Sequence, residues 1–134
     1  MNKTNKTIII AEDEDDIREV YLMALSSAGY DVLQAKNGKE VFEWLEKKDG
    51  EIDLIVLDIV MPEMDGFEVL EKIEESGKYT FIPIIMSTNL DNSEDKKNAL
   101  GHGAKEYFVK SNHTPSELAT HIAKILSEDD KKTV

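Results

Sequence analysis

The sequence predicts an α/β fold in which five parallel strands form one doubly wound sheet with five helices. Short apolar runs rich in β-branched residues alternate along the chain with segments whose apolar residues recur at helical spacing. Three of the runs are apolar throughout rather than at every second residue, as in strands covered on both faces of a parallel sheet. Successive strand–helix units of this kind favour right-handed crossovers.

Each expected element has a local signal. Strands are expected over residues 7–11, 31–35, 54–57, 82–87 and 106–109. The helical stripes are Ile17, Val20, Tyr21, Ala24 and Leu25; Val41, Trp44 and Leu45; Phe67, Leu70 and Ile73; and Leu118, Ile122 and Ile125. Gly29 suits the C-terminal cap of the first helix, and Pro115 the first turn of the last. A fifth helix over 92–100 has only Ala99 and Leu100 as core-like residues, so we expect it to be loosely held.

Length and composition indicate a single domain, 1–134. We place its core at about 6–126 and expect the polar tail 127–134 to fray. Sixteen basic against 28 acidic residues give a formal charge of −12, which argues against nucleic acid and anionic membranes as partners. No cysteine is present, so disulfides and thiolate sites are excluded. Residues 1–7 lead into an apolar run too short for a signal peptide or a membrane span, so a cytoplasmic protein is expected.

Asp58 is the residue that a purely structural role explains least. It follows the apolar run 54–57, at the mouth of a buried strand, where a charge is costly unless a cation or a reacting group accompanies it. The carboxyl ends of the strands form the edge at which open α/β sheets bind ligands. The polar residues expected at that edge are Glu12, Asp13, Asp58, Thr88, Asn89 and Lys110.

The acidic residues at this edge predict a magnesium site. Alone, the run 12–16 is typical of a solvated face, and its later members favour the start of the following helix. Glu12 and Asp13, however, directly follow a buried strand and would meet Asp58, so the three carboxylates would repel one another without a cation. A hard divalent ion that keeps several waters suits such oxygen ligands. An EF-hand is excluded because the run lacks the required glycine and terminal glutamate.

Thr88 and Lys110 would give Asp58 partners for group transfer. In isolation the threonine could cap the next helix, and the lysine could be an ordinary surface residue. Beside Asp58, the ammonium would offset the charge of a phosphorylated carboxylate and the hydroxyl would donate a hydrogen bond. A carboxylate nucleophile with a cation and oxyanion donors indicates acyl-phosphate chemistry.

These residues carry a resemblance to the receiver domain of two-component response regulators, especially the stand-alone chemotaxis type. The resemblance runs from about Lys6 to Leu126. Its motifs are IIAEDE (9–14), LDIVMPEMDG (57–66), PIIMST (83–88) and GAKEYFVK (103–110). It implies a flavodoxin-like fold of the receiver type. It also implies a phosphoacceptor regulatory protein rather than an enzyme, with self-catalysed phosphotransfer and dephosphorylation.

The resemblance also implies a role for each site residue. Asp58 would accept a phosphoryl group from a histidine kinase or a phosphotransfer protein. Mg²⁺ would be bound by Asp13, Asp58 and the backbone carbonyl of Val60, and Glu12 would hold a metal-bound water. The backbone N–H of Asn89 would bind the phosphoryl group.

Thr88 and Tyr107 would form the switch that the resemblance implies. The hydroxyl would move toward the phosphoryl group and the ring would turn inward behind it; the simpler structural interpretation of Tyr107 is a half-buried strand aromatic. The surface reshaped by the switch would be the fourth helix, fifth strand and fifth helix, for a separate and unidentified output protein. A monomer or a weak phosphorylation-dependent dimer is expected. Such a switch needs a bistable element, and helix 92–100 suits that part.

Two positions depart from the family pattern. Ser111 stands where proline usually follows the lysine, and a cis bond without proline costs about 3 kcal/mol, an argument for a trans Lys110–Ser111 bond and a different path of the loop that follows. Asn89 is larger than the usual alanine or glycine, and Val60 and Leu90, at positions that tune hydrolysis in the family, are apolar. Together they predict a narrower entrance and slower phosphorylation and dephosphorylation. An unchanged dephosphorylation rate in Asn89→Ala would refute this for Asn89.

Two other functions stay open. A pseudo-receiver would bind partners regardless of phosphate, and the intact acidic, hydroxyl and lysine set argues against it. An aspartate-nucleophile phosphatase would want a second aspartate where Val60 stands, and a cap insertion for which no segment is long enough. His102, His113 and His121 show no metal-ligand spacing and are expected to be surface or packing residues.

Overall fold

The computed structural model describes residues 5–132, with side chains described up to Glu128. The strands are β1 (Thr7–Ala11), β2 (Asp31–Ala35), β3 (Leu54–Asp58), β4 (Ile84–Thr88) and β5 (Glu106–Val109). The helices are α1 (Asp15–Ser27), α2 (Gly38–Lys47), α3 (Gly66–Ser76), α4 (Ser93–Gly101) and α5 (Pro115–Lys132), with a 3₁₀ turn η1 (Lys110–Asn112).

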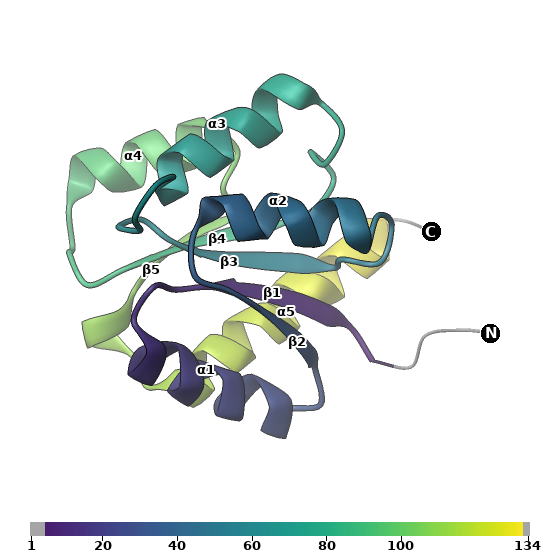
Figure 1. Ribbon diagram of the computed structural model, residues 1–134. Helices are drawn as coiled ribbons and strands as arrows, with labels where there is room; N and C mark the ends of the chain where they lie inside the picture. The colour runs from purple at the N-terminus through teal and green to yellow at the C-terminus, as the bar shows by residue number, and fades with distance from the viewer. Residues whose placement is uncertain (1–4, 133–134) are drawn as a thin grey trace.

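Within the described residues all five strands lie in one parallel sheet, in the order β2-β1-β3-β4-β5. In Figure 1, α1 and α5 cover one face of the sheet, and α2, α3 and α4 cover the other. The chain runs outward from β1 to β2 and then returns to β3, so the strand order reverses at β1. Ligands bind beyond the carboxyl ends of the strands at such a reversal. This is the predicted fold class.

The strand register brings the polar strand ends to one edge of the sheet. Ala11 of β1 lies beside Leu57 of β3, and Thr88 of β4 lies beside Val109 of β5. Because paired parallel strands run in the same direction, the residues that follow these positions emerge together. Sequence positions almost a hundred residues apart therefore meet at the carboxyl edge.

Two apolar clusters hold the helices to the sheet. On the face under α2, α3 and α4, Ile9 and Ile55 are fully buried beside Val69. On the face under α1 and α5, Ile8 and Leu118 are fully buried. Neighbouring strand residues thus serve opposite clusters, which explains why β1 and β3 are buried at every position and mostly apolar.

The strands differ from the expected ranges at three ends, one of which is the end of β4 at Thr88 instead of residue 87. β3 includes Asp58, which pairs with Ser87 of β4. The expectation that the fourth strand starts at residue 82 is wrong, because β4 begins at Ile84. The N–H of Ile82 bonds to the Tyr79 carbonyl in a turn, and Pro83 has no N–H to give to a ladder.

One expectation about the helices needs correction. Val20 belongs to the predicted stripe of α1 but is 48% exposed, whereas Arg18 is buried. Residues 127–132 of the polar tail belong to α5, and residues 133 and 134 lie outside the described part.

The polar helix α4 forms as expected but has little contact with the core. Its buried residue is Ala99, while Leu100, expected to be core-like, is 42% exposed. The Asn92 side chain caps its N-terminus by accepting hydrogen bonds from the N–H groups of Glu94 and Asp95. Across the described chain, every helix is too short or too polar to span a bilayer.

Candidate functional site

The site is built around Asp58, the last residue of β3. Its side chain is buried at the carboxyl edge of the sheet. The loop 59–65 turns back over this edge before α3 begins. Gly66 allows that return: its N–H donates to the Ile59 carbonyl, and a Cβ at this position would lie 2.4 Å from the carbonyl oxygen of Asp58.

Three carboxylates converge at this edge. Glu12, Asp13 and Asp58 each offer an oxygen within 4.8 Å of the other two. Glu12 is buried, and its Oε2 accepts a weak hydrogen bond from the N–H of Glu14, 3.3 Å away. Residues 12 and 13 directly follow β1, so the structure brings together the carboxylates that the sequence predicted would meet.

Lys110 supplies the cation of the site. Its side chain is only 8% exposed, and its Nζ forms an ion pair with Glu12 Oε1. The same Nζ lies 3.5 Å from Asp58 Oδ1. Residue 110 directly follows β5, so one lysine bridges two acidic residues that come from two other strands.

One ammonium among three carboxylates leaves an excess of negative charge. Burial, followed by the hydrogen bond to Glu12, raises the pKa of Asp58 to about 7. Burial also raises the pKa of Glu12, but the hydrogen bond from Asp58 and the Lys110 ammonium outweigh it, so that the pKa of Glu12 falls below its ordinary value. Asp58 therefore loses its proton only around neutral pH, whereas Glu12 is ionised well below it.

This acidic cluster fits a hard divalent cation. Its ligands are carboxylate oxygens, with neither sulfur nor imidazole among them, as magnesium prefers. The raised pKa of Asp13, caused by burial and by Glu12, is a further sign that the carboxylates repel one another. Val60 is 67% exposed two residues beyond Asp58, on the loop above the cluster.

Thr88 and Tyr107, the expected switch pair, both contact the main chain of Leu90. The Thr88 hydroxyl is buried and accepts a hydrogen bond of 3.2 Å from the Leu90 N–H. The Tyr107 hydroxyl donates a 2.8 Å bond to the Leu90 carbonyl. Its ring is only 9% exposed, more buried than the half-buried aromatic of the simpler interpretation. Tyr107 is thus a largely buried strand aromatic whose hydroxyl is held at the Leu90 carbonyl.

The loop after Lys110 has an all-trans backbone. No cis peptide bond occurs among the described residues, and Lys110–Asn112 form a 3₁₀ turn that is closed by the His113 N–H on the Lys110 carbonyl. This agrees with the argument from the cost of a cis bond without proline.

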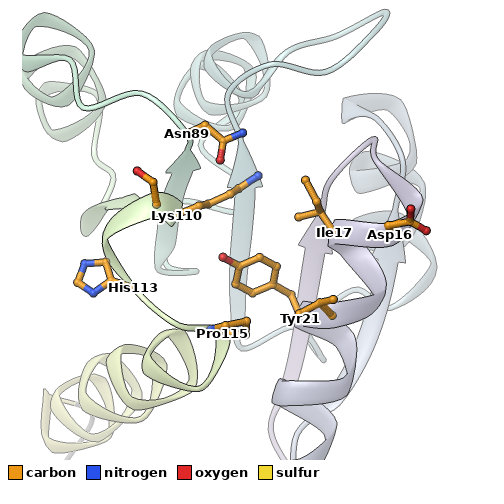
Figure 2. Close-up of a pocket in the computed structure, with 9 residues that line it drawn as sticks. Asp16, Ile17, Tyr21, Asn89, Lys110, His113 and Pro115 are labelled. Carbon is orange, nitrogen blue, oxygen red and sulfur yellow. The ribbon is translucent and has the colours of Figure 1, made fainter.

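A groove of about 370 Å³ runs from the site between α1 and the loop before α5. Figure 2 shows the Lys110 amine and Asn89 at one end of the groove, with Ile17 and Tyr21 along one wall and Pro115 at the other end. Asn89 is exposed and lines this groove.

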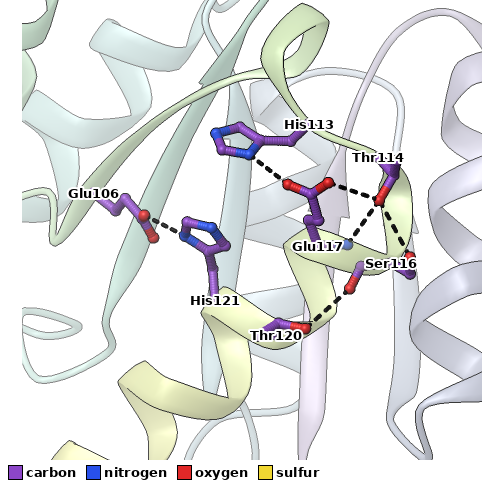
Figure 3. Close-up of polar contacts among 7 residues, drawn as sticks. All are labelled: Glu106, His113, Thr114, Ser116, Glu117, Thr120 and His121. Carbon is purple, nitrogen blue, oxygen red and sulfur yellow. Dashed lines mark hydrogen bonds and ion pairs between the residues drawn. The ribbon is translucent and has the colours of Figure 1, made fainter.

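The three histidines lie away from the acidic cluster. His113 stacks on Phe108 and bonds to Glu117 at 2.8 Å, while His121 pairs with Glu106 (Figure 3). His102 Nδ1 lies 2.9 Å from Glu74 Oε1. None of them belongs to a group of metal-ligand type in the part of the chain that the structure describes, so packing and ion pairing account for them.

Arg18 is a buried residue beside the site that the sequence reasoning did not identify. Its guanidinium donates to the Glu12 carbonyl, to Gln34 and to Asp15. A signal was present: position 18 lies three residues before Tyr21 and seven before Leu25, which places it on the buried stripe of α1.

Comparisons of the sequence and of the fold with known proteins point to one family. The family model described as "Response regulator receiver domain" matches residues 8–123. A protein of Cyanidium caldarium named "Probable transcriptional regulator ycf27" is 38% identical over 125 residues, which are 93% of this chain and 48% of that protein. The chain spans about half the length of the curated relatives it matches.

Solved structures show the same fold. A response regulator receiver domain protein (CheY-like) from Methanospirillum hungatei JF-1 has a TM-score of 0.85 at 28% identity, covering 96% of this chain and 99% of that one. The CheX-CheY-BeF3-Mg+2 complex from Borrelia burgdorferi matches with a TM-score of 0.80 at 26% identity, covering 90% of this chain and 88% of that one. By sequence and by fold alike, this chain belongs to the response regulator receiver domain family.

Proposed function

We propose that the chain is a phosphorylation-activated switch of a two-component phosphorelay, in which Asp58 accepts a phosphoryl group from a histidine kinase or a phosphotransfer protein. One observation carries the proposal: a buried aspartate stands within 3.5 Å of a buried lysine and beside two further carboxylates. A structural ion pair would need only one carboxylate.

The transfer step forms one bond and breaks one. An oxygen of ionised Asp58 attacks the phosphorus, and the phosphorus–nitrogen bond of the donor's phosphohistidine breaks. The imidazole nitrogen keeps the electron pair and takes up a proton. The product is an acyl phosphate on Asp58, so the carboxylate must have lost its own proton before it can react.

The neighbouring residues prepare this step. The Lys110 ammonium would pair first with the Asp58 carboxylate and then with the phosphoryl oxygens. The Thr88 hydroxyl and the Asn89 N–H would donate hydrogen bonds to the same phosphoryl oxygens. Glu12, Asp13, Asp58 and the Val60 carbonyl would hold Mg²⁺, Glu12 through a water. Bound Mg²⁺ would neutralise the carboxylates and the developing charge on the phosphoryl group.

Phosphorylation would change the surface formed by α4, β5 and α5, to which a separate output protein would bind. Moving the Thr88 hydroxyl toward the phosphoryl group would break its bond with the Leu90 N–H and disturb the residue that also anchors Tyr107. Helix α4 follows directly and has little buried contact, so a small free energy would suffice to shift it.

We propose that this region acts on its output by protein contacts. Relatives named as transcriptional regulators are about twice as long as the matched stretch. The charge of −12 on this chain does not suit a nucleic-acid surface, so any DNA contact in such a system would belong to another part or another protein.

Beryllofluoride tests the proposal, because it stands in for a phosphoryl group on an aspartate. Amide NMR spectra of the wild type would be recorded with beryllofluoride and Mg²⁺, beside Asp58→Asn and an exposed control, Asp31→Asn. We expect saturable shifts around Asp58 and along α4 and β5 in the wild type and the control, and none in Asp58→Asn. No binding in the wild type would favour a pseudo-receiver, and steady turnover of a phosphomonoester would favour a phosphatase.

A further inference from the structure

Arg18 has more partners than a residue kept only for helix packing needs. Arg18 is only 7% exposed, and its guanidinium reaches three parts of the fold at once. Nη1 donates to the Glu12 carbonyl at 2.9 Å, Nε to Gln34 Oε1 at 3.1 Å, and Nη2 to Asp15 Oδ1 at 2.6 Å. It thereby ties the end of β1 to the edge strand β2 and to the first turn of α1.

The contact with Glu12 matters because it fixes the peptide between the two acidic residues. The Glu12 N–H is already held by the Ala35 carbonyl at 3.0 Å. With Arg18 on its carbonyl, both main-chain groups of Glu12 are bonded, one on each side of the residue. The direction of the Glu12 carbonyl sets where Asp13 begins, so the guanidinium limits the positions that both carboxylates can take.

Gln34, the partner of Arg18 on β2, is itself held in place by a second helix. Gln34 lies on β2, the edge of the sheet, and its carbonyl accepts a 2.7 Å bond from the Trp44 indole of α2. The side chain that receives Arg18 therefore sits on a strand that a second helix holds in place. A planar guanidinium can serve three such partners at once, whereas a lysine ammonium on a flexible stem cannot match the same fork.

We propose that Arg18 is a positioning residue for the divalent-cation site, acting through the Glu12 carbonyl to hold Glu12 and Asp13 in the cation-binding arrangement. This rests on the proposed function, because it takes the acidic cluster to be a Mg²⁺ site. Arg18 touches neither the cation nor the phosphoryl group in this account. Its effect is on the arrangement of residues that do.

The charge of Arg18 makes the proposal easy to separate from a simple electrostatic effect. A variant that keeps the positive charge at position 18 would leave Mg²⁺ binding unchanged if charge alone mattered. Loss of positioning would instead weaken Mg²⁺ binding. Removing groups that orient metal ligands commonly weakens metal binding by about 10–100-fold, and we expect a weakening of roughly tenfold.

The test is an NMR titration of the purified chain with MgCl₂, beside urea unfolding of each variant. Arg18→Lys keeps the charge and loses the fork, and Gln34→Ala removes an anchor without a buried cavity. Ile122→Val in α5 is the control for general loss of stability, because Ile122 is fully buried in the apolar cluster under α1 and α5. We expect weaker Mg²⁺ binding in Arg18→Lys, a smaller loss in Gln34→Ala, and unchanged binding in Ile122→Val.

The outcomes separate the two proposals. A wild type that does not bind Mg²⁺ would overturn the proposed function. A wild type that binds Mg²⁺, with Arg18→Lys binding it equally well or more tightly, would overturn the role of Arg18 alone. If Arg18→Lys lowers the unfolding midpoint as Ile122→Val does but leaves the Mg²⁺ affinity unchanged, Arg18 is a structural residue only.

Discussion

Asp58 loses its proton near neutral pH rather than near pH 4. Burial and the hydrogen bond to Glu12 raise its pKa to about 7, and only the ionised form is a nucleophile and a metal ligand. We therefore expect the initial rate of phosphorylation by acetyl phosphate to fall about tenfold per pH unit below 7, at a fixed low Mg²⁺ concentration. Quenched-time-point mass spectrometry would measure it. A rate that is flat between pH 5.5 and 8 would contradict the raised pKa.

The same proton makes stability depend on pH in a defined direction. An unfolded aspartate ionises near pH 4, whereas folded Asp58 keeps its proton to about 7, so the folded state loses stability as pH rises from 4 to 7. Asp58→Asn removes this loss. Without Mg²⁺ at pH 8, we expect the variant to be more stable than the wild type by about 1–2 kcal/mol, a value that allows for screening of the charges by water at the site. Near pH 4 we expect the two proteins to be equally stable.

Urea unfolding at the two pH values checks this expectation, with Asp31→Asn as the exposed control. Equal stability of wild type and Asp58→Asn at pH 8 would show that the three carboxylates do not strain the fold.

Helix α3 must start close to Asp58. A Cβ on Gly66 would lie 2.4 Å from the Asp58 carbonyl oxygen, whereas one on Gly101 at the end of α4 would meet nothing within 4 Å. We expect Gly66→Ala to lower the free energy of unfolding by about 1–3 kcal/mol and to slow phosphorylation. The matched Gly101→Ala should raise stability by about 0.5–1 kcal/mol. Thermal unfolding of both variants would measure these changes in stability. Equal effects of the two substitutions would show that the backbone at residue 66 does not lie too close to Asp58 for a side chain.

Helix α4 is tethered to α3 by His102 and Glu74. The hydrogen bond from Glu74 raises the pKa of His102. A raised histidine pKa stabilises the fold fully below the unfolded value near 6.5, and that contribution disappears as pH rises through the folded pKa. Amide exchange in α4, corrected for the intrinsic rate, should therefore speed up between pH 6 and 8 in the wild type but not in Glu74→Gln. The same increase in both would rule out the tether.

Over the whole molecule, the sequence predicts the elements better than their edges. Apolar runs locate β1 and β3 because burial on both faces leaves little choice of residue. The start of β4 was missed because Ile82 is apolar and buried and yet lies in a turn, and apolar character does not distinguish the two. Val20 is a similar case. Its helical spacing predicts a buried residue, but Arg18 occupies the buried position of this turn because of its hydrogen bonds.

The composition of the site was predictable, but its protonation and its support were not. Glu12, Asp58 and Lys110 each end a strand, and parallel topology makes strand ends meet. Which carboxylate keeps the proton depends on distances of a few ångströms, here the contacts with Lys110. The clamp by Arg18 depends on side chains of β2 and α1 that no motif connects.

Intact-mass spectrometry after incubation with acetyl phosphate and Mg²⁺ tests whether Asp58 is covalently phosphorylated. We expect a gain of one phosphoryl group in the wild type, and no gain when EDTA is added before the donor or when Asp58 is replaced in Asp58→Asn. Peptide mapping of the borohydride-reduced sample should place the modification at Asp58. A wild type that stays unmodified under these conditions, or one modified equally in Asp58→Asn, would contradict this expectation.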